Sequence, residues 1–182
     1  LTMGKLLPEF HNEAGELMVN TDELAGYLRD IQALGIEGPV PYLISNLMNL
    51  VKREFPEASR ERREEVYVEL IRRMQEVSSR TDTPQLLFYP VDEIGNSDAK
   101  GKEAHDMCAL IGRVSGAVSY VTVNNYAGGE KWGDTFDIWC GNVQYTREQE
   151  ERLLARGKRY MRYGSAYLHD ARKARSSCGF GF

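Results

Sequence analysis

The chain of 182 residues is 42% hydrophobic and 27% charged, which is enough apolar material for one substantial core, so a single domain over residues 1–182 is expected. Its formal net charge of −4 disfavours nucleic acid as a partner, and no apolar run approaches the roughly 20 residues needed to span a bilayer. The three cysteines and three histidines follow no metal-binding or disulfide pattern, so neither a metal nor a cofactor is predicted.

The first half of the chain predicts two helices and two strands. Residues 20–34 begin with capping residues, space their leucines along one face and end before Gly35, which is typical of a helix. The short apolar segment 38–44 predicts a strand, and residues 59–79 predict a second helix. Another strand is expected over residues 85–91, where an apolar run stops at two acids.

The second half continues the alternation. Residues 98 to about 115 predict a helix that Ser97 or Asp98 caps, and the β-branched segment 117–123 predicts a strand. A Gly-rich loop is expected over residues 127–134. The remaining expectations are a strand at 136–140, a helix at 147–156 between Thr146 and Gly157, a weaker strand at 158–163 and a final helix from 165 to about 176.

This alternation of strands and helices predicts an α/β fold with parallel strands. An open sheet and a closed barrel both fit it, but polar residues follow several different strands, which favours a (β/α)8 TIM-type barrel. No Gly-rich phosphate-binding motif points to an open sheet. A complete barrel needs about 250 residues, and the last six residues resemble the start of a strand, so an incomplete barrel is expected in this chain.

Asp92 and Glu93 are the strongest candidates for chemistry. Two successive carboxyls at the end of a buried strand lose hydration unless they are paired or functional. One of them could instead cap the next helix while the other pairs with a basic neighbour, but Ser97 and Asp98 already stand where a cap belongs. Both acids reach one pocket only if the chain turns there, and Pro90 favours such a departure from strand geometry.

The segment Phe-Tyr-Pro-Val-Asp-Glu at residues 88–93 carries a resemblance. Together with Gly-Ile-x-Gly-Pro-Val at 35–40, Val-Ser-Tyr-Val-Thr-Val-Asn at 118–124 and Phe-Asp-Ile-Trp at 136–139, it resembles the barrel domain of glycoside hydrolase family 123. The resemblance implies a β-N-acetylgalactosaminidase in which the sugar's own 2-acetamido oxygen is the nucleophile. It also implies that Asp92 orients the acetamido group and that Glu93 is the general acid and base.

Four further residues are candidates for sugar binding. Asn124 and Tyr126 follow a predicted strand and could bind a hydroxyl and the acetamido oxygen, although ordinary strand-end residues look the same. Trp132 and, more weakly, Tyr89 could stack on a sugar ring. Trp139 lies inside a predicted strand and is expected in the core.

The expected function is therefore cleavage of a terminal N-acetylhexosamine by a substrate-assisted, retaining glycosidase. Two alternatives remain open: a catalytically silent carbohydrate-binding barrel, and a glycosidase with two catalytic carboxylates. The expected partner is a carbohydrate, with no nucleic acid and no membrane. The sequence predicts a soluble protein and leaves open both its oligomeric state and secretion through a signal peptide that is removed.

Overall fold

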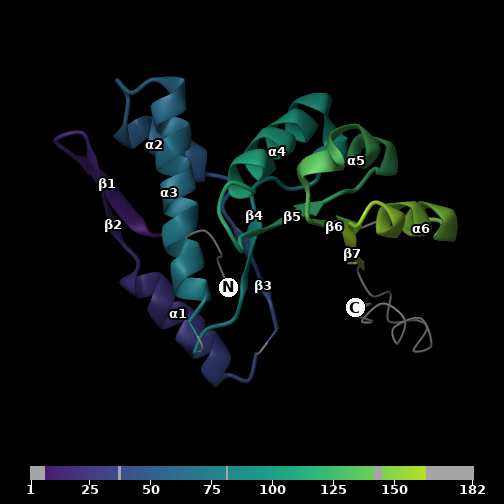
Figure 1. Ribbon diagram of the computed structural model, residues 1–182, viewed down its shortest axis with the longest axis horizontal. Coiled ribbons are helices and arrows are strands. Elements are labelled where there is room, and N and C mark those ends of the chain that lie inside the picture. Colours follow the sequence, from purple (N-terminus) through teal and green to yellow (C-terminus); the bar gives the residue numbers. More distant parts are fainter. Residues whose placement is uncertain (1–6, 37, 81, 142–144, 163–182) are drawn as a thin grey trace. The chain divides into compact units, whose positions relative to one another are not determined.

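The computed structural model describes residues 7–36, 38–80, 82–141 and 145–162. The chain forms two compact units. The first comprises Leu1–Pro90 with Leu110–Val118, and the second comprises Val91–Ala109 with Ser119–Phe182. Both combine helices with strands (Figure 1). Each has its own buried core.

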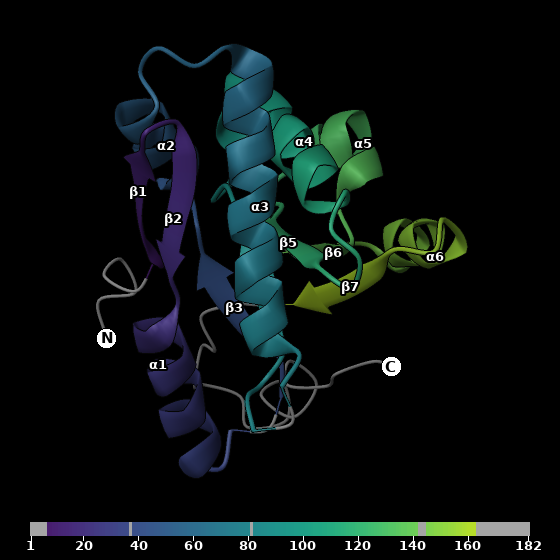
Figure 2. The ribbon, with the colours of Figure 1, turned by 60° about the vertical axis from the view of Figure 1, so that its left-hand side comes forward.

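The first unit combines a hairpin, a parallel strand pair and three helices. The hairpin joins β1 to β2 in antiparallel register through a tight turn at Ala14 and Gly15, which both have positive φ. Strands β3 and β4 are parallel. Helix α3 packs against α1, α2 and β2 (Figure 2). The elements are β1 (Glu9–Glu13), β2 (Glu16–Asn20), α1 (Asp22–Ala33), β3 (Val40–Leu43), α2 (Leu47–Glu54), α3 (Arg60–Ser78) and β4 (Leu86–Tyr89).

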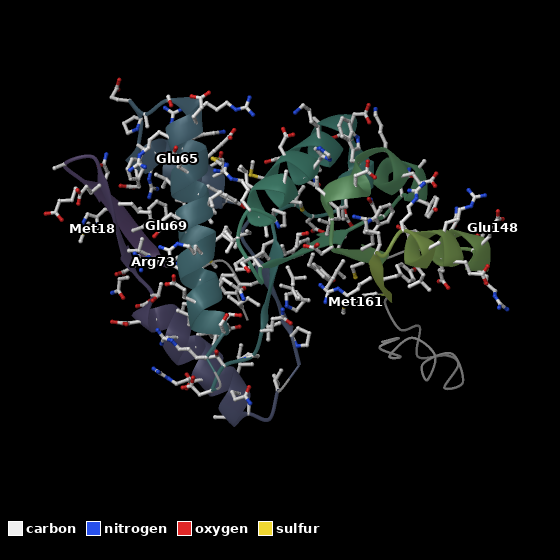
Figure 3. The ribbon with its side chains drawn as sticks, in the orientation of Figure 1. Met18, Glu65, Glu69, Arg73, Glu148 and Met161 are labelled. Atoms are coloured by element: carbon white, nitrogen blue, oxygen red, sulfur yellow. The ribbon has the colours of Figure 1, made fainter. Side chains whose placement is uncertain are left out.

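Helix α3 shows why these segments fold as they do. The Ser59 side chain accepts a hydrogen bond from the Arg62 amide and so starts the helix. Leu70, Ile71 and Met74 recur at helical spacing and are fully buried. The opposite face is charged, with Glu65, Glu69 and Arg73 along its length (Figure 3). The apolar face of α3 therefore builds the core of the first unit.

The second unit holds most of α4 and three parallel strands in the order β5-β6-β7. Its core brings Ala104 and Cys108 of α4 together with Val121 of β5 and Trp139 of β6. Trp139 is 1% exposed, which confirms its prediction as a core residue. The elements are α4 (Asp98–Ile111), β5 (Val118–Thr122), α5 (Tyr126–Trp132), β6 (Ile138–Gly141), α6 (Arg147–Ala155) and β7 (Arg159–Arg162), with short 3-10 helices at Ile94–Asn96 and Gly133–Thr135.

Most of the predicted elements are confirmed, including the parallel strand pairing and the start of a helix after Thr146. The chain is therefore a mixed α/β protein with five parallel strands. Closure of the strands into a barrel, in one domain over residues 1–182, stays a prediction. The expected final helix from residue 165 and the strand-like ending lie outside the described residues. No helix in the described ranges has the length and apolar character needed to cross a bilayer.

Three features differ from the sequence-based expectation. The hairpin β1–β2 and helix α2 were not predicted, and the loop expected at residues 127–134 was wrong, since α5 and a 3-10 helix occupy it. Glycine disfavours helix, but the Asn125 side chain accepts hydrogen bonds from the amides of Ala127 and Gly128 and caps α5. Gly129 then lets the helix approach Trp139 closely, so packing overrides the local preference.

The adjacent glycines of α5 provide a matched test of this packing. A Cβ at Gly129 would lie 2.4 Å from Cζ3 of Trp139 and 2.7 Å from Cγ1 of Val123, whereas a Cβ at Gly128 would meet only the Gly95 Cα at 3.6 Å. Gly129→Ala is expected to lower the free energy of unfolding by about 1–3 kcal/mol through overpacking. Gly128→Ala is expected to raise it by about 0.5–1 kcal/mol through helix propensity. Urea denaturation measures the free energy of unfolding of both variants. Equal changes would contradict the close packing of Gly129 on Trp139.

Candidate functional site

Asp92 and Glu93 lie between two anchored apolar residues. Val91 and Ile94 are buried in the core of the second unit, while Asp92 is exposed and Glu93 is half-buried. The backbone of Glu93 has φ 53° and ψ 63°, the left-handed conformation that residues other than glycine rarely adopt. The chain thus leaves strand geometry at the acids, as Pro90 led us to expect, and enters the 3-10 helix Ile94–Asn96.

One hydroxyl joins the two acids. Thr122, the last residue of β5, is 4% exposed, and its Oγ1 accepts a hydrogen bond from the Glu93 amide at 2.7 Å. The same hydroxyl donates to Oδ1 of Asp92 at 2.6 Å. A hydroxyl has one proton to donate and lone pairs to accept, so the two bonds are compatible. Thr122 therefore fixes both the backbone of Glu93 and the carboxyl of Asp92.

Two asparagines extend this arrangement. Asn124 Oδ1 accepts from the Gly95 amide at 2.6 Å, and Asn124 Nδ2 donates to Oδ1 of Asn96 at 2.7 Å. Asn96 Nδ2 in turn donates to Oε2 of Glu93 at 3.0 Å. We call Asp92, Glu93, Asn96, Thr122 and Asn124 the acid cluster. All five belong to the second unit, so the predicted residues Asp92, Glu93 and Asn124 are brought together.

Neither a helix-capping role nor an ion pair accounts for Glu93. The cap of α4 is Ser97, whose Oγ accepts from the Lys100 amide at 3.2 Å. Within the described ranges no ion pair engages the Glu93 carboxyl, which faces the neutral amide of Asn96. Lys100 donates instead to the backbone oxygen of Asp92 at 3.1 Å, which places a positive charge beside the acids.

Tyr126 packs against the core of the second unit. Its ring lies 6.3 Å from that of Trp139 and 5.2 Å from that of Tyr145, centroid to centroid. The hydroxyl is shielded from solvent and has no hydrogen-bond partner among the described residues. Burial raises the pKa of this hydroxyl, and the nearby Glu130 carboxylate raises it further, so it stays protonated. The acetamido contact expected of Tyr126 stays a prediction.

Trp132 is held by a separate set of contacts. Its Nε1 donates to Oδ1 of Asp98 at 3.3 Å, and the Lys131 ammonium lies 4.9 Å from the ring centroid. A Cβ at Gly101 would lie 2.3 Å from its Cδ1, so the indole packs closely on α4. No hydrogen bond recorded for Trp132 reaches the acid cluster. Its role as a sugar platform stays a prediction, as does that of Tyr89, which ends β4 in the first unit.

The sequence alone did not identify Thr122 and Asn96 as residues of this site. Thr122 fits a β-branched strand, and its position two residues before a pair of asparagines was the only local signal. Asn96 stood in a short segment that carried no periodicity. Among the described residues, no group of three or more His, Cys, Asp and Glu side chains is arranged to hold a metal ion.

Comparison of the chain with protein-family models, with curated proteins and with solved structures gives no match. The resemblance to glycoside hydrolase family 123 therefore rests on the quoted segments alone.

Replacing Glu93 tests the strain at the acid pair. Glu93→Gly is expected to raise the free energy of unfolding by about 0.5–1 kcal/mol, because glycine adopts the left-handed conformation without a Cβ clash. The lost contact to Asn96 is exposed and offsets little of this gain. Glu93→Gln keeps the Cβ and should leave stability unchanged. Denaturant unfolding distinguishes them, and a loss of stability in Glu93→Gly would show that the conformation is not strained.

The hydrogen bond from the Glu93 amide to the Thr122 hydroxyl predicts how fast that amide exchanges its hydrogen with solvent. Thr122→Val keeps the shape of the side chain but leaves the Glu93 amide without its acceptor, so that amide should exchange about tenfold faster. Thr122→Ser keeps the hydroxyl and should retain protection. The Val123 amide, which bonds to the Cys140 carbonyl at 2.8 Å, serves as an internal reference. Equal exchange rates of the Glu93 amide in the two variants would contradict its hydrogen bond to Thr122.

Proposed function

We propose that this protein is a glycoside hydrolase that removes a terminal N-acetylhexosamine by substrate assistance. The observation that supports this function best is the Thr122 hydroxyl, which holds both acids, while Asn96 connects the Glu93 carboxyl to Asn124. The proposed fold is a (β/α)8-type barrel, incomplete in this chain, with the acid cluster at strand ends where such barrels carry their sites. The proposed partner is a carbohydrate.

The two acids have different surroundings, and these suit different roles. Oδ1 of Asp92 accepts a hydrogen bond from the Thr122 hydroxyl, which sets the orientation of the carboxylate. Such a carboxylate can accept a hydrogen bond from the acetamido N–H and turn the acetamido oxygen toward the anomeric carbon. Glu93, on the strained turn, is the proton donor and acceptor. Asn124 is positioned to bind a sugar hydroxyl.

The reaction then has two balanced steps. The acetamido oxygen bonds to the anomeric carbon as the glycosidic bond breaks, and the Glu93 carboxyl gives its proton to the leaving oxygen. Glu93, now a carboxylate, takes a proton from water while that water attacks the anomeric carbon and reopens the ring formed by the acetamido group. Retention of configuration follows from two inversions at the same carbon. No second nucleophilic carboxylate is needed.

A second candidate function has an observation of its own. Glu93 is half-buried, and its carboxyl accepts a hydrogen bond from Asn96, which is a polar setting. A general acid usually needs apolar surroundings that keep it protonated, whereas a polar cluster of carboxylates and amides suits the binding of sugar hydroxyls. This arrangement favours a carbohydrate-binding protein without turnover. A glycosidase with two catalytic carboxylates has no observation of this kind.

Hydrolysis assays separate these functions. An aryl N-acetyl-β-galactosaminide should be cleaved, and the matching aryl galactoside, which lacks the acetamido group, should not. Glu93→Gln should lower kcat by about 10²–10⁴-fold through loss of the general acid. Glu103→Gln, at an exposed position on α4, is the control and should leave kcat unchanged.

Three outcomes would overturn the proposal in different ways. Unchanged turnover in Glu93→Gln removes Glu93 from catalysis. Cleavage of both substrates points to two catalytic carboxylates. Saturable binding of N-acetylgalactosamine, with no turnover by the unmodified chain, points to the carbohydrate-binding alternative.

A further inference from the structure

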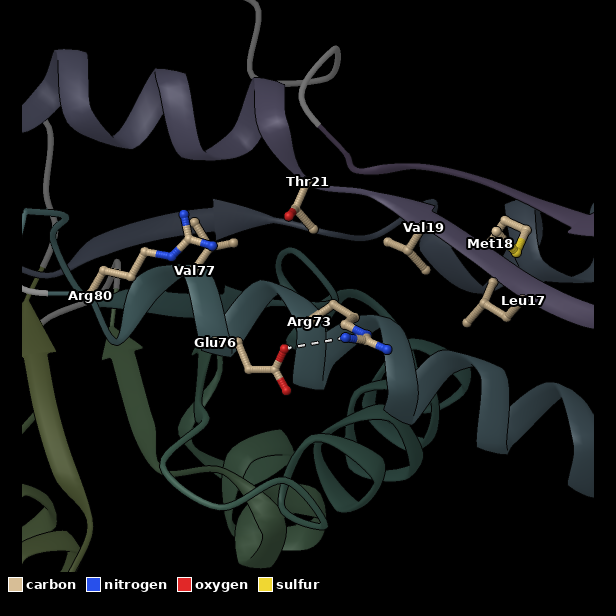
Figure 4. A pocket seen from close by; sticks show the side chains of 8 residues that line it. All are labelled: Leu17, Met18, Val19, Thr21, Arg73, Glu76, Val77 and Arg80. Atoms are coloured by element: carbon tan, nitrogen blue, oxygen red, sulfur yellow. Dashed lines mark ion pairs between the residues drawn. The ribbon is translucent and has the colours of Figure 1, made fainter.

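The first unit contains a hollow between the hairpin and helix α3 (Figure 4). None of the residues that line it belongs to the acid cluster. Its volume is about 440 Å³, which falls in the lower part of the range of small-molecule sites. Residues of β2 and the following Thr21 line one side, and the C-terminal half of α3 with Arg80 lines the other. All of them belong to the same unit, so the shape of the hollow is set within it.

The two ends of the hollow differ in chemistry. Leu17 and Val19 alternate along β2 and are half-buried, and Met18 is 43% exposed. Figure 4 shows these three side chains at one end and Arg80 at the other, with Val77 beside Arg80. A ligand that follows the hollow therefore meets an apolar wall and then a guanidinium.

Two polar groups of the hollow are not used by the fold. Thr21 precedes α1, but its side chain makes no capping hydrogen bond, and Oδ1 of Asn20 accepts from the Asp22 amide at 2.9 Å. Arg80 follows α3, and in the ranges that the structure describes no carboxylate pairs with it. A hydroxyl and a guanidinium are thus both available as donors to a ligand.

The remaining charges in the hollow offset one another. Arg73 donates to Oε1 of Glu69 at 2.9 Å and lies 3.7 Å from Oε2 of Glu76. Glu76 is also paired with Arg72. Because two guanidinium groups neutralise the Glu76 carboxylate, it does not cancel the charge of Arg80. The polar end of the hollow keeps a net positive charge.

We propose that this hollow binds a small organic carboxylate with an aliphatic body. The carboxylate accepts hydrogen bonds from the Arg80 guanidinium and the Thr21 hydroxyl, and the aliphatic body lies against Leu17, Val19 and Val77. Guanidinium matches the two oxygens of a carboxylate better than ammonium does. A medium-chain fatty acid and the C-terminal carboxylate of an apolar peptide both have this chemistry. The site is independent of the proposed glycosidase activity.

Titration with octanoate, followed by amide shifts in the NMR spectrum of the whole chain, tests the site. Octanoate should saturate with a dissociation constant on the order of 1 mM, as expected for a ligand of this size, and shift the amides of Val19, Thr21 and Arg80. Octanol, which lacks the charge, and acetate, which lacks the chain, should each bind at least about tenfold more weakly. N-acetyl-leucyl-valine distinguishes the two sources, since tighter binding than octanoate assigns the hollow to peptide C-termini and weaker binding assigns it to fatty acids.

Arg80→Gln should weaken octanoate binding about tenfold and remove the preference over octanol. Arg29→Gln, at an exposed position of α1 that does not line the hollow, is the matched control and should bind octanoate like the unmodified chain. Both positions are on the surface, so both variants should fold, which the NMR spectrum reports directly. Equal affinity of the two variants, octanol binding as tight as octanoate, or the absence of saturable shifts would each overturn the proposal.

Discussion

The geometry of the acid pair depends on the Thr122 hydroxyl. Its single oxygen connects the end of β5 to two consecutive residues, through the Glu93 amide and through Oδ1 of Asp92. Because Thr122 is almost fully buried, its hydroxyl oxygen has little freedom to move and therefore fixes the positions of both acids. The rest of the acid cluster extends outward from this contact. Its polar groups satisfy one another at the point where the chain leaves the core.

The same contact explains how a strained conformation persists. Glu93 takes the left-handed region without the freedom of glycine, which costs stability unless the surroundings enforce it. Val91 and Ile94 anchor the segment from both sides in the core, and Gly95 sits so close to Asn124 that a Cβ there would lie 2.5 Å from Oδ1. Strain held by neighbours in this way is typical of functional sites, and here it turns the Glu93 carboxyl out of strand alternation.

Much of the fold was predictable because its signals are local. Apolar spacing located α3, the capping residue Thr146 located α6, and a run of β-branched residues located β5. The acids were found because two carboxyls at a strand end are chemically costly. Thr122 and Asn96 were not found, because the contacts of Thr122 with Asp92 and of Asn96 with Asn124 join separate segments, which only the folded chain brings together. Helix α5 was missed for a related reason, since its glycines matter through packing on Trp139.

In the proposed function, Asp92 faces the acetamido group of a bound sugar and Glu93 faces the oxygen on the anomeric carbon of the same sugar. A crystal structure of the chain with N-acetylgalactosamine measures this directly. We expect the acetamido N–H within hydrogen-bonding distance of the Asp92 carboxyl and the anomeric oxygen within hydrogen-bonding distance of Glu93. A sugar bound with its acetamido group turned away from Asp92, or bound at a place that excludes both acids, would contradict these roles of Asp92 and Glu93.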